Sequence, residues 1–346
     1  MRAIVYDRYG APENLELRLM PAPVPNANEV LVRVRAASLN PKDSLIRKGK
    51  FKAVLWVDSA FAQTSRRARG EGRPTGALPR PSSLSASSPG FPRLLGYDLA
   101  GVVEAVGANV TQFKAGDEVF GMKNGFTGST VAELAVANED ELAKKPTSLS
   151  FEEAAALPLT SLTALQALRD LGKVTSGSRV LIHGASGGVG VVAVQLAKAL
   201  GATVTTTSSQ QNLDFVRGLG ADEALDYTKS IGLERGREWT CVFDVFGNQR
   251  FSKAAPALAS GGVYVTTVPS PRNVFDDLRT RWLPFKKARL VVVKSNRADL
   301  EVLSKLVAQG SLRAVIDRVV PLSDTAAGQA HIETKRARGK VVVTID

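Results

Sequence analysis

The sequence predicts an α/β protein with two parts, a β-rich part and a doubly wound parallel sheet. Valine-rich runs bounded by Gly, Pro and Asn occupy residues 2–7, 29–39 and 100–107, which is typical of strands. Residues 179–209 then read as strand, glycine turn, helix and strand, the pattern of a parallel sheet with crossover helices. The last segment, 339–346, returns to β character. A chain of 346 residues is long enough for two domains.

Composition restricts the class of protein. Hydrophobic residues make up 44% of the chain, as in a packed protein. The opening "MRAIVYDRYG" alternates like a strand and lacks the regions of a signal peptide. Apolar runs fall short of the ~18 residues that a membrane span needs. We therefore expect a cytoplasmic protein with no membrane partner.

Metal-binding side chains are scarce. The chain has one cysteine, Cys241, and two histidines, His183 and His331. An intrachain disulfide and a cysteine-built zinc site are thus excluded. Any metal centre would depend on carboxylates, which disfavours zinc.

The net charge of +12 allows nucleic acid, an anionic membrane or a phosphorylated ligand as partner. Much of this charge lies at 64–74 and 279–289, without the regular aromatic residues of a nucleic-acid platform. We interpret most of it as solvated surface and keep nucleic acid as the minority alternative.

Further elements follow from local signals. Ser150 precedes Glu153 at capping-box spacing and predicts a helix that ends before Pro158. A second helix is expected at about 161–171. The remaining predicted elements are strands in 241–246, 261–268 and 288–294, and a helix over 297–310.

Residues 56–90 fit neither pattern, because they are rich in Ser, Arg, Pro and Gly without a sustained period. We favour a mobile surface loop over the alternative, a lid for substrate or partner.

The stretch "HGASGGVG" (183–190) predicts a phosphate-binding turn. Its glycines let the backbone approach a pyrophosphate, and the following helix start stabilises negative charge. The alternative is a tight helix entry without a ligand; the strand–turn–helix–strand context favours a dinucleotide. The predicted cofactor residues here are Gly184, Ser186, Gly187, Gly188, Val189 and Gly190.

The next strand end favours NADPH over NADH. NAD-preferring folds carry an acidic residue about 20 residues after the turn. This chain has Ser208 and Ser209 there and no carboxylate before Asp214. A 2′-phosphate would meet hydroxyl groups and no like charge, although Arg217 is the nearest cation in the sequence.

Motifs along nearly the whole chain resemble the zinc-independent quinone oxidoreductase and enone reductase branch of the medium-chain dehydrogenase/reductase superfamily. They are "SLNPKDSLIRKG", "GYDLAGVVEAVG", "FKAGDEVFG", "AAALPLTSLTA", "GASGGVG" and "RGKVVV". The resemblance implies a GroES-like catalytic domain from 1–140 and 295–346, a Rossmann domain from 141–294, and an active site in the cleft between them. The 56–90 insertion has no counterpart in the usual pattern.

The resemblance also implies that no zinc is bound. Zinc-dependent members place a cysteine where this chain has Asn40 and a histidine and glutamate where it has Tyr97 and Asp98. Without a Lewis acid, oxidation of an alcohol is disfavoured. Reduction of a quinone or an α,β-unsaturated carbonyl needs only proximity to the nicotinamide and donors for the developing anion.

The family match places four candidate catalytic residues at the cleft. Tyr97 is a candidate proton donor to a carbonyl oxygen, with a packed tyrosine as the alternative. Asn40 is a candidate donor and Asp43 a candidate orienting residue, with turn formation as the alternative. Relatives often carry a tyrosine or lysine at the position of Leu45, so Lys42 is the candidate substitute.

Further cofactor contacts are implied by the resemblance, with core packing as the alternative for the hydrophobic ones. They are Thr160, Thr163, Asn212, Tyr227, Phe246, Gly247 and Val268. His183 and Asp244 are interpreted as structural.

The sequence therefore predicts an NADPH-dependent reductase of quinones or enones. The edge strand 288–294 makes a homodimer plausible. The alternatives are an NADPH-binding, possibly RNA-binding, protein with little turnover, and an alcohol dehydrogenase-like reductase.

Overall fold

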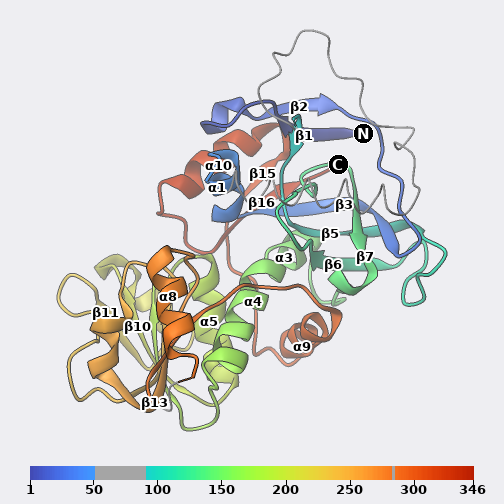
Figure 1. Ribbon diagram of the computed structural model, residues 1–346. Helices are drawn as coiled ribbons and strands as arrows, with labels where there is room; N and C mark the ends of the chain where they lie inside the picture. The colour runs from blue at the N-terminus through green and yellow to red at the C-terminus, as the bar shows by residue number, and fades with distance from the viewer. Residues whose placement is uncertain (51–90, 283–284) are drawn as a thin grey trace.

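The structure, a computed structural model, describes residues 1–50, 91–282 and 285–346. The chain folds into two lobes, and both termini lie in the same one (Figure 1). The predicted insertion 56–90 lies outside the described residues.

The lobe with the termini contains two sheets. A small antiparallel sheet has the order β2 (Glu16–Leu19), β1 (Arg2–Tyr6), β4 (Arg93–Leu94). The larger sheet has the order β15 (Ile316–Pro321), β16 (Lys340–Thr344), β3 (Glu29–Leu39), β5 (Asp98–Val106), β6 (Glu118–Met122), β8 (Leu142–Lys144). A further strand, β7 (Leu134–Asn138), pairs with β3 outside this order. The last strand of the chain thus lies beside β3, in the middle of the fold.

The second lobe is built on a parallel sheet. Its order is β11 (Glu223–Asp226), β10 (Thr203–Ser208), β9 (Arg179–His183), β12 (Trp239–Asp244), β13 (Leu258–Thr266), β14 (Lys287–Leu290). Numbered along the chain, this is the order 3-2-1-4-5-6 of a doubly wound dinucleotide-binding sheet. The predicted fold class is confirmed, and the order reverses between β9 and β12.

The helices connect and cover these sheets. They are α1 (Pro41–Arg47), α3 (Phe151–Ala155), α4 (Pro158–Leu165), α5 (Gly188–Ala199), α6 (Leu213–Arg217), α7 (Phe251–Ala254), α8 (Pro271–Thr280), α9 (Arg297–Ala308) and α10 (Thr325–Glu333). The capping box at α3 is confirmed, because Ser150 Oγ accepts from the Glu153 N–H at 3.2 Å and the Glu153 carboxylate accepts from the Ser150 N–H at 2.9 Å.

Two predicted boundaries shift. The helix expected from residue 161 begins at Pro158, since a proline at the first helical position loses no helical hydrogen bond. It continues as a π-helical segment, Gln166–Leu171. The strand expected over 288–294 ends at Leu290, where β13, its partner among the described strands, ends at Thr266.

One apolar cluster contains residues of both lobes, and each lobe also has a cluster of its own. Phe120 and Val342 from the first lobe belong to the same buried cluster as Ile182 and Phe243 from the parallel sheet. β8 pairs with β6, so the first lobe's sheet extends a few residues past the predicted boundary at 140. No described helix is both long and apolar enough to cross a bilayer.

Candidate functional site

The glycine turn leaves open space at the start of α5. Gly184 follows β9 with φ of 79°, a conformation that favours glycine. A Cβ on Gly190 would lie 2.2 Å from the Gly184 carbonyl oxygen, so the helix packs directly on the strand end. A Cβ on Gly187 would meet nothing closer than 3.7 Å. The first N–H groups of α5 lack helical partners and, with the helix dipole, favour an anion in this space.

The turn after β10 lies against the glycine turn. Asn212 Nδ2 donates to Ser186 Oγ at 3.2 Å. Ser208 Oγ and Asn212 Oδ1 are buried, and neither has a hydrogen-bond partner among the described residues. Ser209 precedes the 3₁₀ turn Gln210–Asn212. This part of the predicted cofactor site thus offers polar atoms that the protein itself leaves unused.

Apolar side chains stand at the carboxyl edge of the parallel sheet. Tyr227, Phe246 and Val268 follow β11, β12 and β13 and are 55%, 50% and 37% exposed. Gly247 has φ of 72°, and a Cβ there would lie 2.1 Å from Val268 Cγ2. These residues are not core, contrary to the packing alternative, and their position suits a nucleotide that crosses the sheet edge.

The two threonines of α4 lie beside this edge but use their hydroxyl hydrogens within the helix. Thr160 Oγ1 donates to the carbonyls of Ala156 and Leu157, and Thr163 Oγ1 donates to that of Leu159 at 2.6 Å. Their hydroxyl oxygens are therefore available only as acceptors.

His183 and Asp244 are structural, as predicted. His183 Nδ1 lies 2.8 Å from Thr207 Oγ1, and burial lowers the histidine pKa to about 4, so the ring is neutral. The Asp244 carboxylate accepts from the N–H groups of Gly247 and Gln249, both at 2.8 Å, and fixes the turn after β12.

A buried polar cluster links the two lobes near the glycine turn. The Asp98 carboxylate accepts from Ser38 Oγ at 2.6 Å, from Asn40 Nδ2 at 2.9 Å and from the Leu159 N–H at 2.8 Å. The Lys340 ammonium lies 3.5 Å from the same carboxylate. Because Leu159 is in the first turn of α4, the carboxylate also stabilises that helix end.

Lys340 is the buried cation of this cluster. Its Nζ donates to the Leu39 carbonyl at 3.0 Å and to Asn40 Oδ1 at 2.5 Å. Burial lowers its pKa, while Asp98 and Asp43 raise it. Its stem passes the start of α5, since a Cβ on Gly188 would lie 3.2 Å from Lys340 Cδ.

The predicted role of Asn40 as a donor to substrate does not fit this geometry. Its amide hydrogens point to Asp98 and to the Ser38 carbonyl, and its oxygen accepts from Lys340. Asn40 would have to give up one of these bonds to reach a ligand. It holds the cluster together instead.

Asp43 orients its neighbours, in line with its predicted role. Its carboxylate accepts from the Asn40 N–H at 2.7 Å and from the Gly96 N–H at 3.2 Å. Burial raises the pKa of Asp43 to about 7, although the Asn40 N–H and Lys340 oppose this shift.

Lys42 is held over the ring of Tyr97. Its ammonium lies 3.7 Å from the ring centre, a cation–π contact, and donates to the Gly125 carbonyl at 2.6 Å. Burial lowers the pKa of Lys42 to about 8. Tyr97 is only 2% exposed and belongs to the shared core, so its ring serves as a platform for the ammonium.

Family models match both parts of the chain. Residues 77–147 match the alcohol dehydrogenase GroES-like domain, and residues 219–343 match a zinc-binding dehydrogenase domain. A chloroplast envelope quinone oxidoreductase homolog from Arabidopsis thaliana is 34% identical over 99% of this chain and 98% of its own. A 2-methylene-furan-3-one reductase from Solanum lycopersicum is 35% identical over 99% of this chain and 79% of its own.

The chain belongs to the medium-chain dehydrogenase/reductase superfamily. The solved quinone oxidoreductase from Coxiella burnetii has the same fold, with a TM-score of 0.81 and 32% identity over 100% of this chain and 99% of that one. The predicted resemblance and an oxidoreductase activity are thereby confirmed.

Three positions at which the resemblance implies zinc ligands in zinc-dependent relatives are Asn40, Tyr97 and Asp98 in this chain. Asn40 accepts a hydrogen bond from Lys340, and Asp98 forms an ion pair with the same lysine. The Tyr97 ring lies under the Lys42 ammonium. In the described part of the chain, no group of three or more His, Cys, Asp or Glu side chains could hold a metal ion.

Sequence reasoning missed two residues of the site, Arg338 and Lys340. Gly339, between them, forms a parallel bridge with Gly187 and donates its N–H to the Ser186 carbonyl at 3.1 Å. The signal was present, since "RGK" stands directly before the final strand in a motif that carried the resemblance. Its proximity to the glycine turn depends on tertiary structure and was not visible from spacing.

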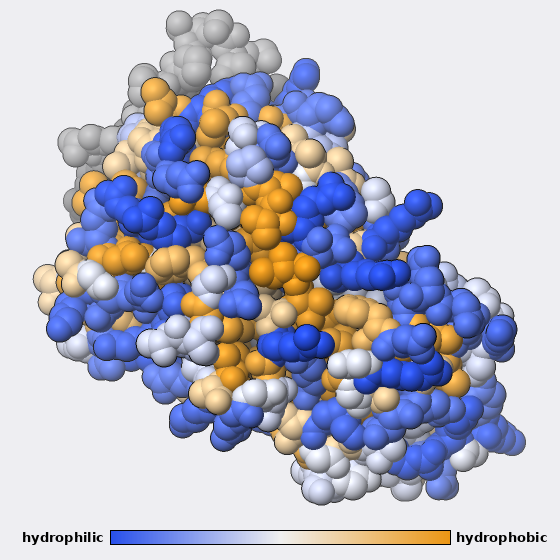
Figure 2. Space-filling model, turned by 180° about the vertical axis from the view of Figure 1, so that it is seen from behind, coloured by the Kyte–Doolittle hydropathy of each residue, from blue (hydrophilic) through white to orange (hydrophobic). Residues whose placement is uncertain are grey.

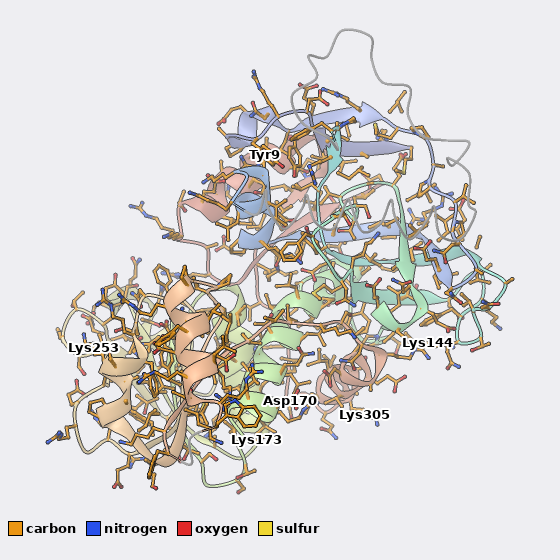
Figure 3. The ribbon with its side chains drawn as sticks, in the orientation of Figure 1. Tyr9, Lys144, Asp170, Lys173, Lys253 and Lys305 are labelled. Atoms are coloured by element: carbon orange, nitrogen blue, oxygen red, sulfur yellow. The ribbon has the colours of Figure 1, made fainter. Side chains whose placement is uncertain are left out.

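The surface supports this location of the site. Seen from behind, apolar residues gather along the boundary between the lobes, with hydrophilic residues on both sides (Figure 2). Two hollows lie elsewhere. One is lined by Asp170 and Lys173, which Figure 3 labels, and by Thr240 of β12 and Gly261 of β13. These two residues lie in the amino-terminal halves of their strands, so this hollow is at the edge of the parallel sheet opposite the glycine turn. The other lies between Lys144 and Lys305.

Proposed function

We propose that this protein reduces a quinone or an α,β-unsaturated carbonyl with NADPH and without zinc. The observation that carries the proposal is the Lys42 ammonium, held over the Tyr97 ring, while Asn40, at a position where the resemblance implies a zinc ligand in relatives, accepts a hydrogen bond from Lys340. The quinone oxidoreductase and enone reductase names of the relatives agree with it.

The residues present fit the cofactor. The glycine turn leaves space that a Cβ would fill, and Ser208 Oγ and Asn212 Oδ1, which have no partner among the described residues, lie at the end of β10, where a Rossmann fold would hold the adenosine ribose. When bound, NADPH supplies the hydride. The protein holds the acceptor between the two lobes, which provides proximity, and excludes water along the apolar boundary.

Lys42 provides the proton. With a pKa of about 8, its ammonium is charged at neutral pH yet weakly solvated, so it stabilises negative charge on a carbonyl oxygen and then donates a proton to it. The contacts with Tyr97 and Gly125 aim the ammonium without neutralising it. Asn40 and Asp43 cap the start of α1, the helix that carries Lys42.

We also propose a homodimer. Beside the edge strand β14, the helix α8 carries the exposed apolar side chains of Phe275 and Leu278, and Trp282, which follows the helix, is 88% exposed. A second copy that pairs along β14 would cover them. A cytoplasmic location stays a prediction.

The reductase is tested by NADPH and NADH consumption with chelator-treated protein and a panel of quinones and enones. We expect turnover with NADPH that survives chelation. Activity that disappears with the chelator and returns with zinc would contradict a zinc-free mechanism. Cofactor binding without turnover of any acceptor would favour the binding-protein alternative.

A further inference from the structure

The hollow beside Asp170 and Lys173 lies where a helix ends irregularly (Figure 3). The chain leaves α4 through the π-helical segment Gln166–Leu171, and Lys173 follows with φ of 53°. That φ is uncommon for a residue with a Cβ and costs energy. Gly172 fixes this end against the sheet, because a Cβ there would lie 2.7 Å from Cys241 Sγ. The backbone thus holds Lys173 beside the hollow in a conformation that a lysine usually avoids.

Another wall of the hollow is a bulge in β13. Trp239 of β12 pairs with Leu258 of β13. The next pair is Cys241 and Val263, so β13 has extra residues between the two pairs and bulges there. Gly261, within the bulge, has φ of 73°, and a Cβ there would meet no atom within 4 Å. Because π-helical turns and β-bulges are frequent at functional sites, their meeting at one hollow indicates a binding site.

The hollow is lined by cations that the protein leaves unpaired. Lys173, Lys287 and Arg289 line it. The ammonium groups of Lys173 and Lys287 form no ion pair or hydrogen bond with the described residues. The two lysines come from different elements, the end of the π-helical segment and the edge strand β14.

The nearby carboxylates do not offset these two lysines. Asp170 accepts from both Nε and the terminal nitrogen of Arg169, at 2.6 and 2.8 Å. Asp277 of α8 lies 3.2 Å from Arg281 and 3.4 Å from Arg289, so it is shared between two arginines. The lining therefore keeps a positive charge that attracts an anion.

The rest of the lining suits a small organic anion. Thr240 Oγ1 accepts from the Arg179 N–H at 3.2 Å, so its hydroxyl hydrogen is available to a ligand. Leu171 and Val263 supply an apolar wall. The volume of about 230 Å³ is below the ~300–1,000 Å³ of pockets for drug-sized ligands, so the hollow admits a small molecule.

We propose that this hollow binds a small phosphate ester, with Lys173 and Lys287 on the phosphate and Thr240 as a further donor. A phosphate with nearly two negative charges matches two unpaired ammonium groups better than one carboxylate does. The site is separate from that of the dinucleotide. At ~3.3 Å per residue, Thr240 lies ~13 Å along β12 from Asp244, which fixes the turn at the other edge of the sheet.

The test is isothermal titration calorimetry of the whole protein with glycerol 3-phosphate, inorganic phosphate and glycerol at constant ionic strength. Saturating NADPH is present, so that the dinucleotide site does not take the phosphate. We expect the ester to bind with a Kd of about 1 mM or lower, inorganic phosphate to bind more weakly, and glycerol not to bind. Lys173→Gln and Lys287→Gln should each weaken binding of the ester about tenfold, because each removes a charge-assisted hydrogen bond.

The matched control is Lys305→Gln, which removes an ammonium from the other hollow and should bind the ester like the wild type. Equal weakening in Lys305→Gln would show attraction by net charge alone and overturn the proposal. Ester binding that is absent in the wild type, or unchanged in both Lys173→Gln and Lys287→Gln, would overturn it as well. Inorganic phosphate that binds more tightly than the ester would exclude an ester as the ligand.

Lys173→Gly separates binding from folding. It removes the ammonium together with the unfavourable φ, so it should weaken ester binding about tenfold and raise the melting temperature. A lower melting temperature in Lys173→Gly would show that Lys173 serves the fold and would overturn its role as a ligand-binding residue. None of these measurements needs turnover, so a protein that reduces no acceptor would refute the reductase and leave the phosphate site standing.

Discussion

The Nζ of Lys340 lies 2.5 Å from Oδ1 of Asn40, although 300 positions separate the two residues in the sequence. Through this contact the last strand supports the N-terminus of α1, the helix that carries Lys42 and Asp43. The cation also balances the buried carboxylate of Asp98.

The ion pair of Lys340 and Asp98 predicts that substitutions at these two residues have coupled effects on the free energy of unfolding. Asp98→Asn leaves the Lys340 ammonium buried without its counter-ion and should lower the free energy of unfolding by about 3 kcal/mol. Lys340→Met should cost less, since Asp98 keeps three hydrogen-bond donors. In urea unfolding, the double variant should lose less than the sum of the two. Strict additivity would show that the two charges do not interact.

Lys42 should control the rate and its pH dependence. Lys42→Met removes the proton donor, and we expect kcat to fall about 100-fold or more. In the wild type, kcat should fall as the pH rises through about 8, because the ammonium loses its proton there. The control is Lys48→Met, whose ammonium pairs with Glu333 at 2.7 Å. A Lys42→Met profile identical to the wild type would exclude the role.

The glycine turn offers a matched pair of substitutions. Gly187 has extended backbone, with φ of −81° and ψ of 173°, so Gly187→Ala should fold normally and weaken dinucleotide binding by filling the ligand space. Gly190→Ala places its Cβ against the Gly184 carbonyl and should cost about 1–3 kcal/mol of stability. Thermal unfolding and cofactor titration of both variants distinguish the effects. If Gly187→Ala binds NADPH like the wild type, the space beside Gly187 does not hold the pyrophosphate.

Asp43 should make the fold less stable as the pH rises. Its pKa is about 7 in the folded protein, above the usual value of 3.8 for an aspartate, so between these values the unfolded chain binds fewer protons at this site. The free energy of unfolding should therefore decline from about pH 4 to 7. Comparison with Asp43→Asn over this range isolates the contribution, since that variant should lack this decline. Parallel curves would show that Asp43 titrates normally.

The parallel sheet and its glycine turn could be predicted because they depend on local signals, such as Gly184 after an apolar strand. The buried cluster could not, because it requires Asn40, Asp98 and Lys340 to meet from three distant segments. The same reason explains why the sequence pointed to Arg217, and not to Arg338, as the arginine nearest the turn after β10. Arg217 is close to the turn after β10 in sequence but engaged with Asp214, whereas Arg338 reaches the turn only through the pairing of β16 with β3.

The apolar core common to both lobes also determines how the molecule melts. Because Phe120 and Val342 pack in the same cluster as Ile182 and Phe243, loss of one lobe would expose the shared part of the other lobe's apolar interior to water. Heating should then produce a single calorimetric transition rather than one for each lobe. We therefore expect neither lobe to fold alone. A chimera that exchanges one lobe must also supply the side chains of that lobe that pack in the shared cluster.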